Sequence, residues 1–270
     1  MKFAICNEMF GDQPFPEAFA IARECGYTGI ELAPFTIGSD AMSIDSAKRK
    51  EVTAQAAAAD LEVIGLHWLL AKTEGYYLTS PDAEVRKKTA DYFRELTRLC
   101  AEVGGKIMVL GSPQQRNLLP GVNHEEAMKY AADVIAAAEP TLVECGVTLA
   151  LEPLGPAEGD FLNTADLGAE LMQMIDSTHV KLHLDVKAMS TEPTEIPSII
   201  EKHATRTAHF HANDPNLLGP GMGDVEFQPI FTALKTSGYD GWVSVEVFDY
   251  EPGAEHIART SMQNMLKAIG

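Results

Sequence analysis

Val147-Thr148-Leu149-Ala150-Leu151-Glu152 is the segment that decides the fold. Its composition favours a β-strand, and Gly146 and Pro153 mark its two ends. Side chains alternate between the two faces of a strand. One face therefore carries three apolar side chains, and the other carries small side chains that lead to Glu152 at the carboxyl end.

Three later segments repeat this design and end in a potential metal ligand: Val180–Asp185, Thr207–His211 and Trp242–Glu246. Alternation along each segment puts Asp185, His211 and Glu246 on the face that corresponds to the face of Glu152. Four strands thus deliver one ligand each at the same end and on the same face.

The whole chain alternates short β-forming segments with helical ones. The expected strands are Lys2–Cys6, Tyr27–Leu32, Leu61–His67, Ile107–Leu110, Val147–Glu152, Val180–Asp185, Thr207–His211 and Trp242–Glu246. The expected helices are Pro14–Cys25, Ser43–Asp60, Pro81–Val103, His124–Cys145, Thr164–Ile175, Glu195–His203, Phe227–Ser237 and Ala254–Ile269.

This alternation predicts a parallel sheet, and eight units in 270 residues predict a single (β/α)8 TIM barrel, with one domain over residues 1–270. The alternative is a doubly wound open sheet. Its dinucleotide-binding form needs Gly-x-Gly-x-x-Gly after the first strand, and Asn7–Asp12 does not match that motif.

The composition narrows the choice of partners. Lys and Arg number 21 against 39 Asp and Glu, a net charge of −18, which disfavours nucleic acid and anionic membrane surfaces. The four cysteines form no Cys-x-x-Cys pair, which favours buried free thiols in a reducing compartment. The N-terminus is too briefly apolar for a signal peptide, so the cytoplasm is the expected location.

In a barrel, inward-facing residues at the carboxyl ends of strands meet at one mouth, where active sites are built. Three buried carboxylates without counter-charges repel one another, and one divalent cation removes that cost. Three oxygens and one imidazole suit Mn²⁺, Mg²⁺, Co²⁺ or Fe²⁺, with Mn²⁺ favoured, and catalytic Zn²⁺ stays an alternative. The predicted ligands are Glu152, Asp185, His211 and Glu246. The competing interpretation is a solvated carboxylate or a helix cap at each position.

The chain resembles the xylose-isomerase-like TIM-barrel superfamily, in its sugar (phosphate) isomerase and epimerase branch, with D-tagatose 3-epimerase and hydroxypyruvate isomerase as relatives. The resemblance covers the whole chain and is carried by four motifs: Leu151-Glu152-Pro153-Leu154, His183-Leu184-Asp185, His209-Phe210-His211-Ala212-Asn213-Asp214 and Ser244-Val245-Glu246-Val247.

The resemblance implies a metal-dependent isomerase or epimerase of a small sugar, keto-sugar or sugar derivative. The four matched positions would hold one cation, and Glu152 and Glu246 would also be the catalytic acid/base pair. A cation bound to adjacent carbonyl and hydroxyl oxygens acidifies the C–H between them and stabilises the enediolate. One glutamate would remove the proton, and the other would return one.

Four more residues are expected to bind substrate: His67, Trp68, Glu158 and Lys187. His67 and Trp68 could hydrogen-bond to and stack on a sugar. The alternative for His67 is a core histidine, but its inward parity at the catalytic end favours the site role. Glu158 matches a carboxylate that contacts substrate hydroxyls in the family, or is a solvated loop residue. Lys187 could bind an anionic substrate or be solvated.

Two features depart from the epimerase pattern. Ala188 stands where the epimerases carry a histidine, and the loop Pro215–Gly223 lacks their substrate-binding arginine. These differences imply different substrate contacts. The glycines of the same loop, Gly219, Gly221 and Gly223, could cradle a phosphate or simply form a flexible loop or lid.

Other functions fit parts of the pattern. A metal-dependent dehydratase or lyase of a keto-cyclitol or keto-sugar begins with the same proton abstraction. An endonuclease-IV-like nuclease needs more histidines and a basic face, which Ala188 and the net charge of −18 oppose. A binding protein without turnover would not need an intact ligand set. The expected partners are a carbohydrate substrate and further copies of the chain, as a homodimer or homotetramer.

Overall fold

Eight parallel strands close into a barrel in the computed structural model, which describes all residues from Met1 to Gly270. The strands are β1 Lys2–Cys6, β2 Gly29–Leu32, β3 Glu62–Leu66, β4 Ile107–Leu110, β5 Thr148–Leu151, β6 Val180–Asp185, β7 Thr207–Ala212 and β8 Trp242–Val245. They are hydrogen-bonded in sequence order, and β1 also pairs with β8. The predicted TIM barrel is therefore confirmed.

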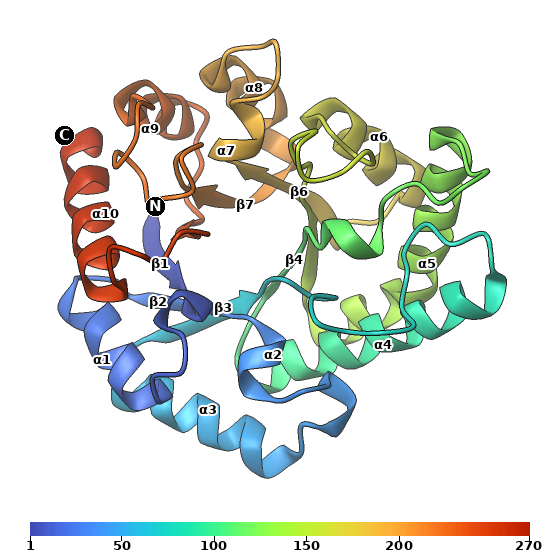
Figure 1. Cartoon of the computed structure of the whole chain (residues 1–270), viewed down its shortest axis with the longest axis horizontal. Coiled ribbons are helices and arrows are strands. Elements are labelled where there is room, and N and C mark those ends of the chain that lie inside the picture. The colour runs from blue at the N-terminus through green and yellow to red at the C-terminus, as the bar shows by residue number, and fades with distance from the viewer.

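Helices surround the strands on every side (Figure 1). They are α1 Phe15–Glu24, α2 Pro34–Ile37, α3 Ser46–Ala58, α4 Ala83–Glu102, α5 His124–Cys145, α6 Ala165–Ile175, α7 Val186–Met189, α8 Ile196–His203, α9 Phe227–Thr236 and α10 Ala254–Ile269. The eight long helices agree with the predicted ones to within a few residues. The single turns α2 and α7, and short 3-10 turns such as η1 Asn7–Phe10, were not predicted.

Local chemistry explains where the long helices begin and end. Asp45 caps α3 by accepting a hydrogen bond from the backbone N–H of Lys48. Asn123 and Glu126 form a capping box at the start of α5. That helix ends at Gly146, whose φ of 62° is the left-handed conformation that glycine adopts without strain.

The register of β6, β7 and β8 sets the polar side chains level with one another. A register shift between Leu182 and His183 leaves His183 opposite His209 and Asp185 opposite His211. Residues level on neighbouring strands and on the same face are close neighbours. The interior of the barrel therefore contains a polar layer near its carboxyl end.

The core outside this layer is hydrophobic and continuous through the barrel and its helices. All four cysteines are free, and three are buried, whereas Cys145 is partly exposed. The expectation of buried thiols thus holds for three of the four. No helix has both the length and the apolar character needed to cross a membrane.

Candidate metal and active site

The four predicted ligands lie at one end of four consecutive strands. Asp185 ends β6 and His211 lies near the end of β7, whereas Glu152 and Glu246 directly follow β5 and β8. All four side chains are buried. Their positions at the carboxyl ends of the strands agree with the sequence, and their role as ligands stays a prediction.

Three of the four come together, with one histidine that was not predicted as a ligand. Ligand atoms of Glu152, His183, Asp185 and His211 all lie within 4.8 Å of one another. Glu246 joins this group through His211, because its Oε2 lies 3.0 Å from His211 Nδ1. The arrangement is a possible metal-binding site with oxygen and imidazole ligands.

The electrostatics of this group fit a cation. Burial, and then the negative charges of Glu246 and Asp185, raise the pKa of Glu152 well above its usual value. Burial also raises the pKa of Asp185. Both nitrogens of His183 are buried without a hydrogen-bond partner. A divalent ion would compensate the carboxylates, which is the expected chemistry of this set of ligands.

His211 is held from its other side by Glu31, which the sequence analysis missed. Glu31 is fully buried on β2, and its Oε2 lies 3.2 Å from His211 Nε2 and 2.9 Å from His209 Nε2. Although burial opposes it, the two histidines lower the pKa of Glu31 well below its usual value. A carboxylate behind a ligating histidine fixes its tautomer and ring orientation.

His67 does not reach a position where it could touch a substrate. Its side chain is fully buried, and its Nε2 lies 2.6 Å from Glu8 Oε2. It lines neither of the two large cavities of the molecule. The expected substrate contact by His67 is therefore corrected to a structural contact inside the barrel, the alternative that the sequence had left open.

Trp68, Glu158, Glu152 and Glu246 line one cavity of about 380 Å³ at the barrel mouth, which we call the reactive pocket. The indole of Trp68 is stacked on Phe248 with ring centroids 6.0 Å apart. This size is within the usual range for small-molecule sites, about 300 to 1,000 Å³. Trp68 and Glu158 thus line this pocket, and their contacts with a substrate stay a prediction.

Lys187 is neither solvated nor free for an anion. Its side chain is largely buried, and its Nζ lies 2.7 Å from Glu158 Oε1. The same ammonium group lies over the ring of Phe248, 4.6 Å from the centroid. Lys187 therefore orients Glu158 at the edge of the reactive pocket, an arrangement between residues 29 positions apart that spacing alone does not reveal.

The glycine loop after β7 is tied down internally. The backbone N–H groups of Gly221 and Gly223 donate to Asp214 Oδ2 at 3.2 and 3.1 Å. A carboxylate thus occupies the donors that a phosphate would need. The phosphate-cradle interpretation is wrong for these two glycines.

One buried cation near the site was also missed. Arg116 is 2% exposed and follows the short turn η3 Pro113–Gln115. Its Nη1 donates to the carbonyl of Leu110, and its Nη2 has no partner. Burial lowers the pKa of Arg116 to about 10, opposed by Glu152 and Glu158. No motif marks this arginine in the sequence.

The fold and this site define a parallel eight-stranded barrel with oxygen and imidazole ligands at its carboxyl-end mouth. The family model described as "Xylose isomerase-like TIM barrel" matches residues 19–269. The chain belongs to this family.

The chain is also similar to individual proteins, at moderate or low sequence identity. A "Probable ketose 3-epimerase" of Synechocystis is 25% identical over 258 residues, which cover 91% of this chain and 82% of that protein. A "D-psicose 3-epimerase" of Enterocloster bolteae is 35% identical over 113 residues, which cover 42% of this chain and 38% of that protein. A solved D-psicose 3-epimerase from Clostridium cellulolyticum has a TM-score of 0.86 at 19% identity and covers 100% of this chain and 99% of its own.

Proposed function

We propose that the protein is a divalent-metal-dependent epimerase that inverts the carbon next to the carbonyl of a keto-sugar. The observation that carries this proposal is that Glu152 and Glu246 line the same pocket beside the His183, Asp185 and His211 cluster. The names of the curated relatives, ketose 3-epimerase and D-psicose 3-epimerase, support the same reaction class.

The residues that would hold the cation are Glu152, Asp185, His211 and Glu246. When bound, a divalent ion polarises the substrate carbonyl and so acidifies the neighbouring C–H. Mn²⁺ is the first ion to test, since these four residues offer hard oxygen ligands and one imidazole, with His183 beside them.

The two glutamates are suited to moving the proton. Glu246 has a lowered pKa because the positive charge of His211 outweighs burial, so it is ready to accept a proton as a base. Burial and the charges of Glu246 and Asp185 raise the pKa of Glu152, whereas a bound cation would favour its charged form. Two carboxylates that line one pocket can remove a proton from a substrate carbon and return one to it.

The test is deuterium exchange at the substrate carbon. Metal-loaded protein is incubated with ketoses in deuterated water, and the sugars are analysed by mass spectrometry and NMR. We expect deuterium at the carbon next to the carbonyl and appearance of the epimer. Glu152→Gln and Glu246→Gln should each abolish turnover, whereas Glu125→Gln, an exposed residue of α5, should not.

The same experiment separates the competing reaction classes. Loss of water or of a leaving group would indicate the dehydratase or lyase predicted as the alternative. Full activity of Glu246→Gln would contradict the acid/base roles. Full activity in a chelator would contradict the metal.

A further inference from the structure

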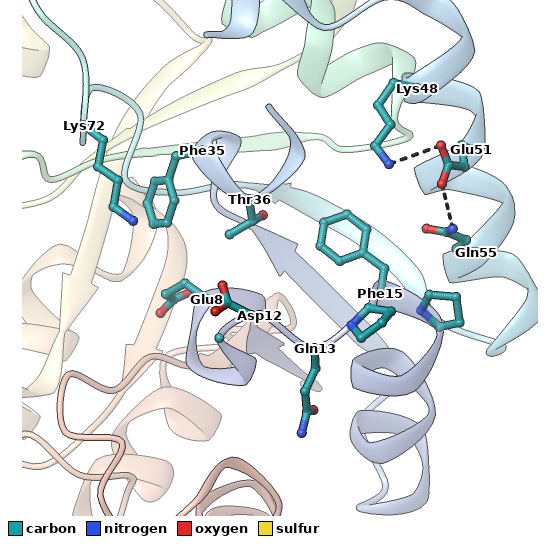
Figure 2. Close-up of a pocket in the computed structure, with 13 residues that line it drawn as sticks. Glu8, Asp12, Gln13, Phe15, Phe35, Thr36, Lys48, Glu51, Gln55 and Lys72 are labelled. Carbon is teal, nitrogen blue, oxygen red and sulfur yellow. Dashed lines mark hydrogen bonds and ion pairs between the residues drawn. The ribbon is translucent and has the colours of Figure 1, made fainter. Parts of the chain in front are cut away.

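A second cavity of about 510 Å³ lies beside the reactive pocket and has no part in the proposed reaction. It is formed by η1, the loop after it, the start of α1, α2 and one face of α3, and we call it the outer cavity (Figure 2). Figure 2 shows Phe35 and Lys72 on one side of this cavity and the group Lys48, Glu51 and Gln55 of α3 on the other.

The outer cavity adjoins the reactive carboxylate. Glu8 lines the outer cavity and Glu246 lines the reactive pocket, and their ligand oxygens lie within 4.8 Å of each other and of a His67 nitrogen. Lys72 lines both cavities. The two cavities are therefore immediate neighbours.

An aromatic wall also runs from one cavity to the other. Trp68 of the reactive pocket lies between Phe248 and Phe35, with ring centroids 6.0 and 5.8 Å away. Phe15 adds a further ring to the outer cavity. Aromatic faces of this kind bind the C–H faces of sugar rings through apolar contact.

Two buried acceptors in the outer cavity lack donors. Glu8 is 6% exposed, and its Oε1 has no hydrogen-bond partner, although its Oε2 is bound to His67. Gln55 Oε1 is likewise buried and unpartnered. Buried acceptors are normally satisfied, so a ligand here should supply hydrogen-bond donors.

The charges of the outer cavity disfavour an anionic ligand. Glu8, Asp12 and Glu51 are acidic, and the ammonium of Lys48 is already bound to Glu51 at 3.1 Å. Lys72 is the remaining cation, and it lies over the ring of Phe35. A phosphate or carboxylate would meet more negative than positive charge, whereas a hydroxyl-rich neutral group would meet acceptors and rings.

We propose that the substrate is a keto-sugar that carries a second sugar unit. The ketose unit reacts in the reactive pocket, and the second unit occupies the outer cavity against Phe15, Phe35 and the acceptors of Glu8 and Gln55. This inference rests on the proposed epimerase function and adds the size and chemistry of its substrate.

The experiment compares fructose with three glucosyl-fructoses, linked through O4 (maltulose), O5 (leucrose) or O6 (isomaltulose). Exchange of the C3 hydrogen with deuterium is measured with Mn²⁺-loaded protein at several sugar concentrations. We expect the best disaccharide to exceed fructose in kcat/KM by about tenfold or more, mainly through a lower KM. Equal or higher kcat/KM for fructose would overturn the proposal while leaving the epimerase function intact.

Two variants localise the effect to the outer cavity. Gln55→Trp fills the cavity from α3 and should lower kcat/KM for the disaccharide by about tenfold, while fructose stays within about twofold. Ala57→Trp, exposed on the same helix and outside the cavity, should change neither. Equal losses on both sugars in Gln55→Trp would also overturn the proposal.

If no sugar exchanges deuterium, the proposed epimerase function is contradicted. Sugar binding then tests the second-sugar site on its own. Calorimetric titration of the protein with each disaccharide then measures occupancy of the outer cavity directly. Binding of a disaccharide that Gln55→Trp removes and Ala57→Trp retains would support the second-sugar site. Absence of binding by all three would reject it.

Discussion

The indole Nε1 of Trp68 donates a hydrogen bond of 2.6 Å to Glu246 Oε1. The other oxygen of Glu246 lies 3.0 Å from His211 Nδ1, so both carboxylate oxygens are held. Trp68 itself has a φ of 52°, an uncommon left-handed conformation for a bulky residue, and such strain is frequent at functional sites. Trp68 thus positions Glu246, in addition to the sugar contact that the sequence suggested.

Replacing Trp68 with Phe should keep an aromatic ring beside Phe248 and remove only the hydrogen bond. Hydrogen bonds to charged groups contribute about 1.5 to 3 kcal/mol, so we expect kcat to fall by about tenfold to a hundredfold. KM should change little, since the ring remains. Steady-state kinetics on the best substrate measures both. Trp242→Phe, at the start of β8, is the matched control, and a purely KM-based loss in Trp68→Phe would contradict the positioning role.

Gly111 is required by its close approach to Glu152. A Cβ at this position would overlap Glu152 Oε2, so Gly111→Ala must displace that carboxylate. We expect the variant to lose most of the increase in melting temperature that Mn²⁺ gives the wild-type protein, because binding to the folded state stabilises it. Differential scanning calorimetry with and without Mn²⁺ tests this. An unchanged Mn²⁺ effect would mean that Glu152 is not needed for the ion.

Glu31 should matter for stability as well as for His211. Glu31→Ala leaves His209 and His211 without their shared buried partner, and breaking such a pair costs about 3 to 5 kcal/mol. Glu31→Gln keeps the shape and should cost less. Urea unfolding in a chelator measures the free energy of unfolding without any metal contribution. Glu62→Gln, which removes an exposed ion pair with Lys2, is the control and should have little effect.

We expect the free energy of unfolding to depend on pH through His203, the last residue of α8. Burial lowers its pKa below 6.5, although Asp166 lies 3.0 Å from its Nε2. The unfolded chain therefore binds the proton more readily than the folded one. The contribution of His203 to stability is complete above about pH 6.5 and is lost as the pH falls from there through the lowered pKa.

The variant His203→Gln isolates this contribution. The free energy of unfolding of the wild-type protein minus that of the variant should be constant at pH 7 to 8 and should decrease towards pH 5. Urea titrations at each pH give the difference. A difference that stays constant over the whole range would show that His203 does not titrate differently on folding.

The sequence was sufficient for those features that depend on local periodicity. Strand parity located Glu152 and Asp185, because alternation within a few residues fixes the face. It could also have suggested His183 and His209, which share the parity of Asp185 and His211 two residues later. The single turns α2 and α7 were missed because four residues are too few to show a helical period.

Contacts between distant parts of the chain could not be predicted in this way. Glu31 and His209 are 178 positions apart, and only the closure of the barrel brings them together. Trp68 and Glu246, which are joined by a hydrogen bond, are also 178 positions apart. Arg116 lies in a polar loop, and nothing in its local sequence indicates that it is buried.

The pair of Glu31 and His209 in the middle of the barrel bears on any attempt to make this protein withstand heat. Well-packed hydrocarbon side chains often match or exceed a buried ion pair in stability. A redesign that replaced both residues at once and selected for thermal survival alone would therefore tend to give robust barrels in which His211 has lost the carboxylate behind it. Libraries should instead keep these two codons fixed and vary the outer surface, where Met42, Val143 and Leu266 leave apolar side chains in water.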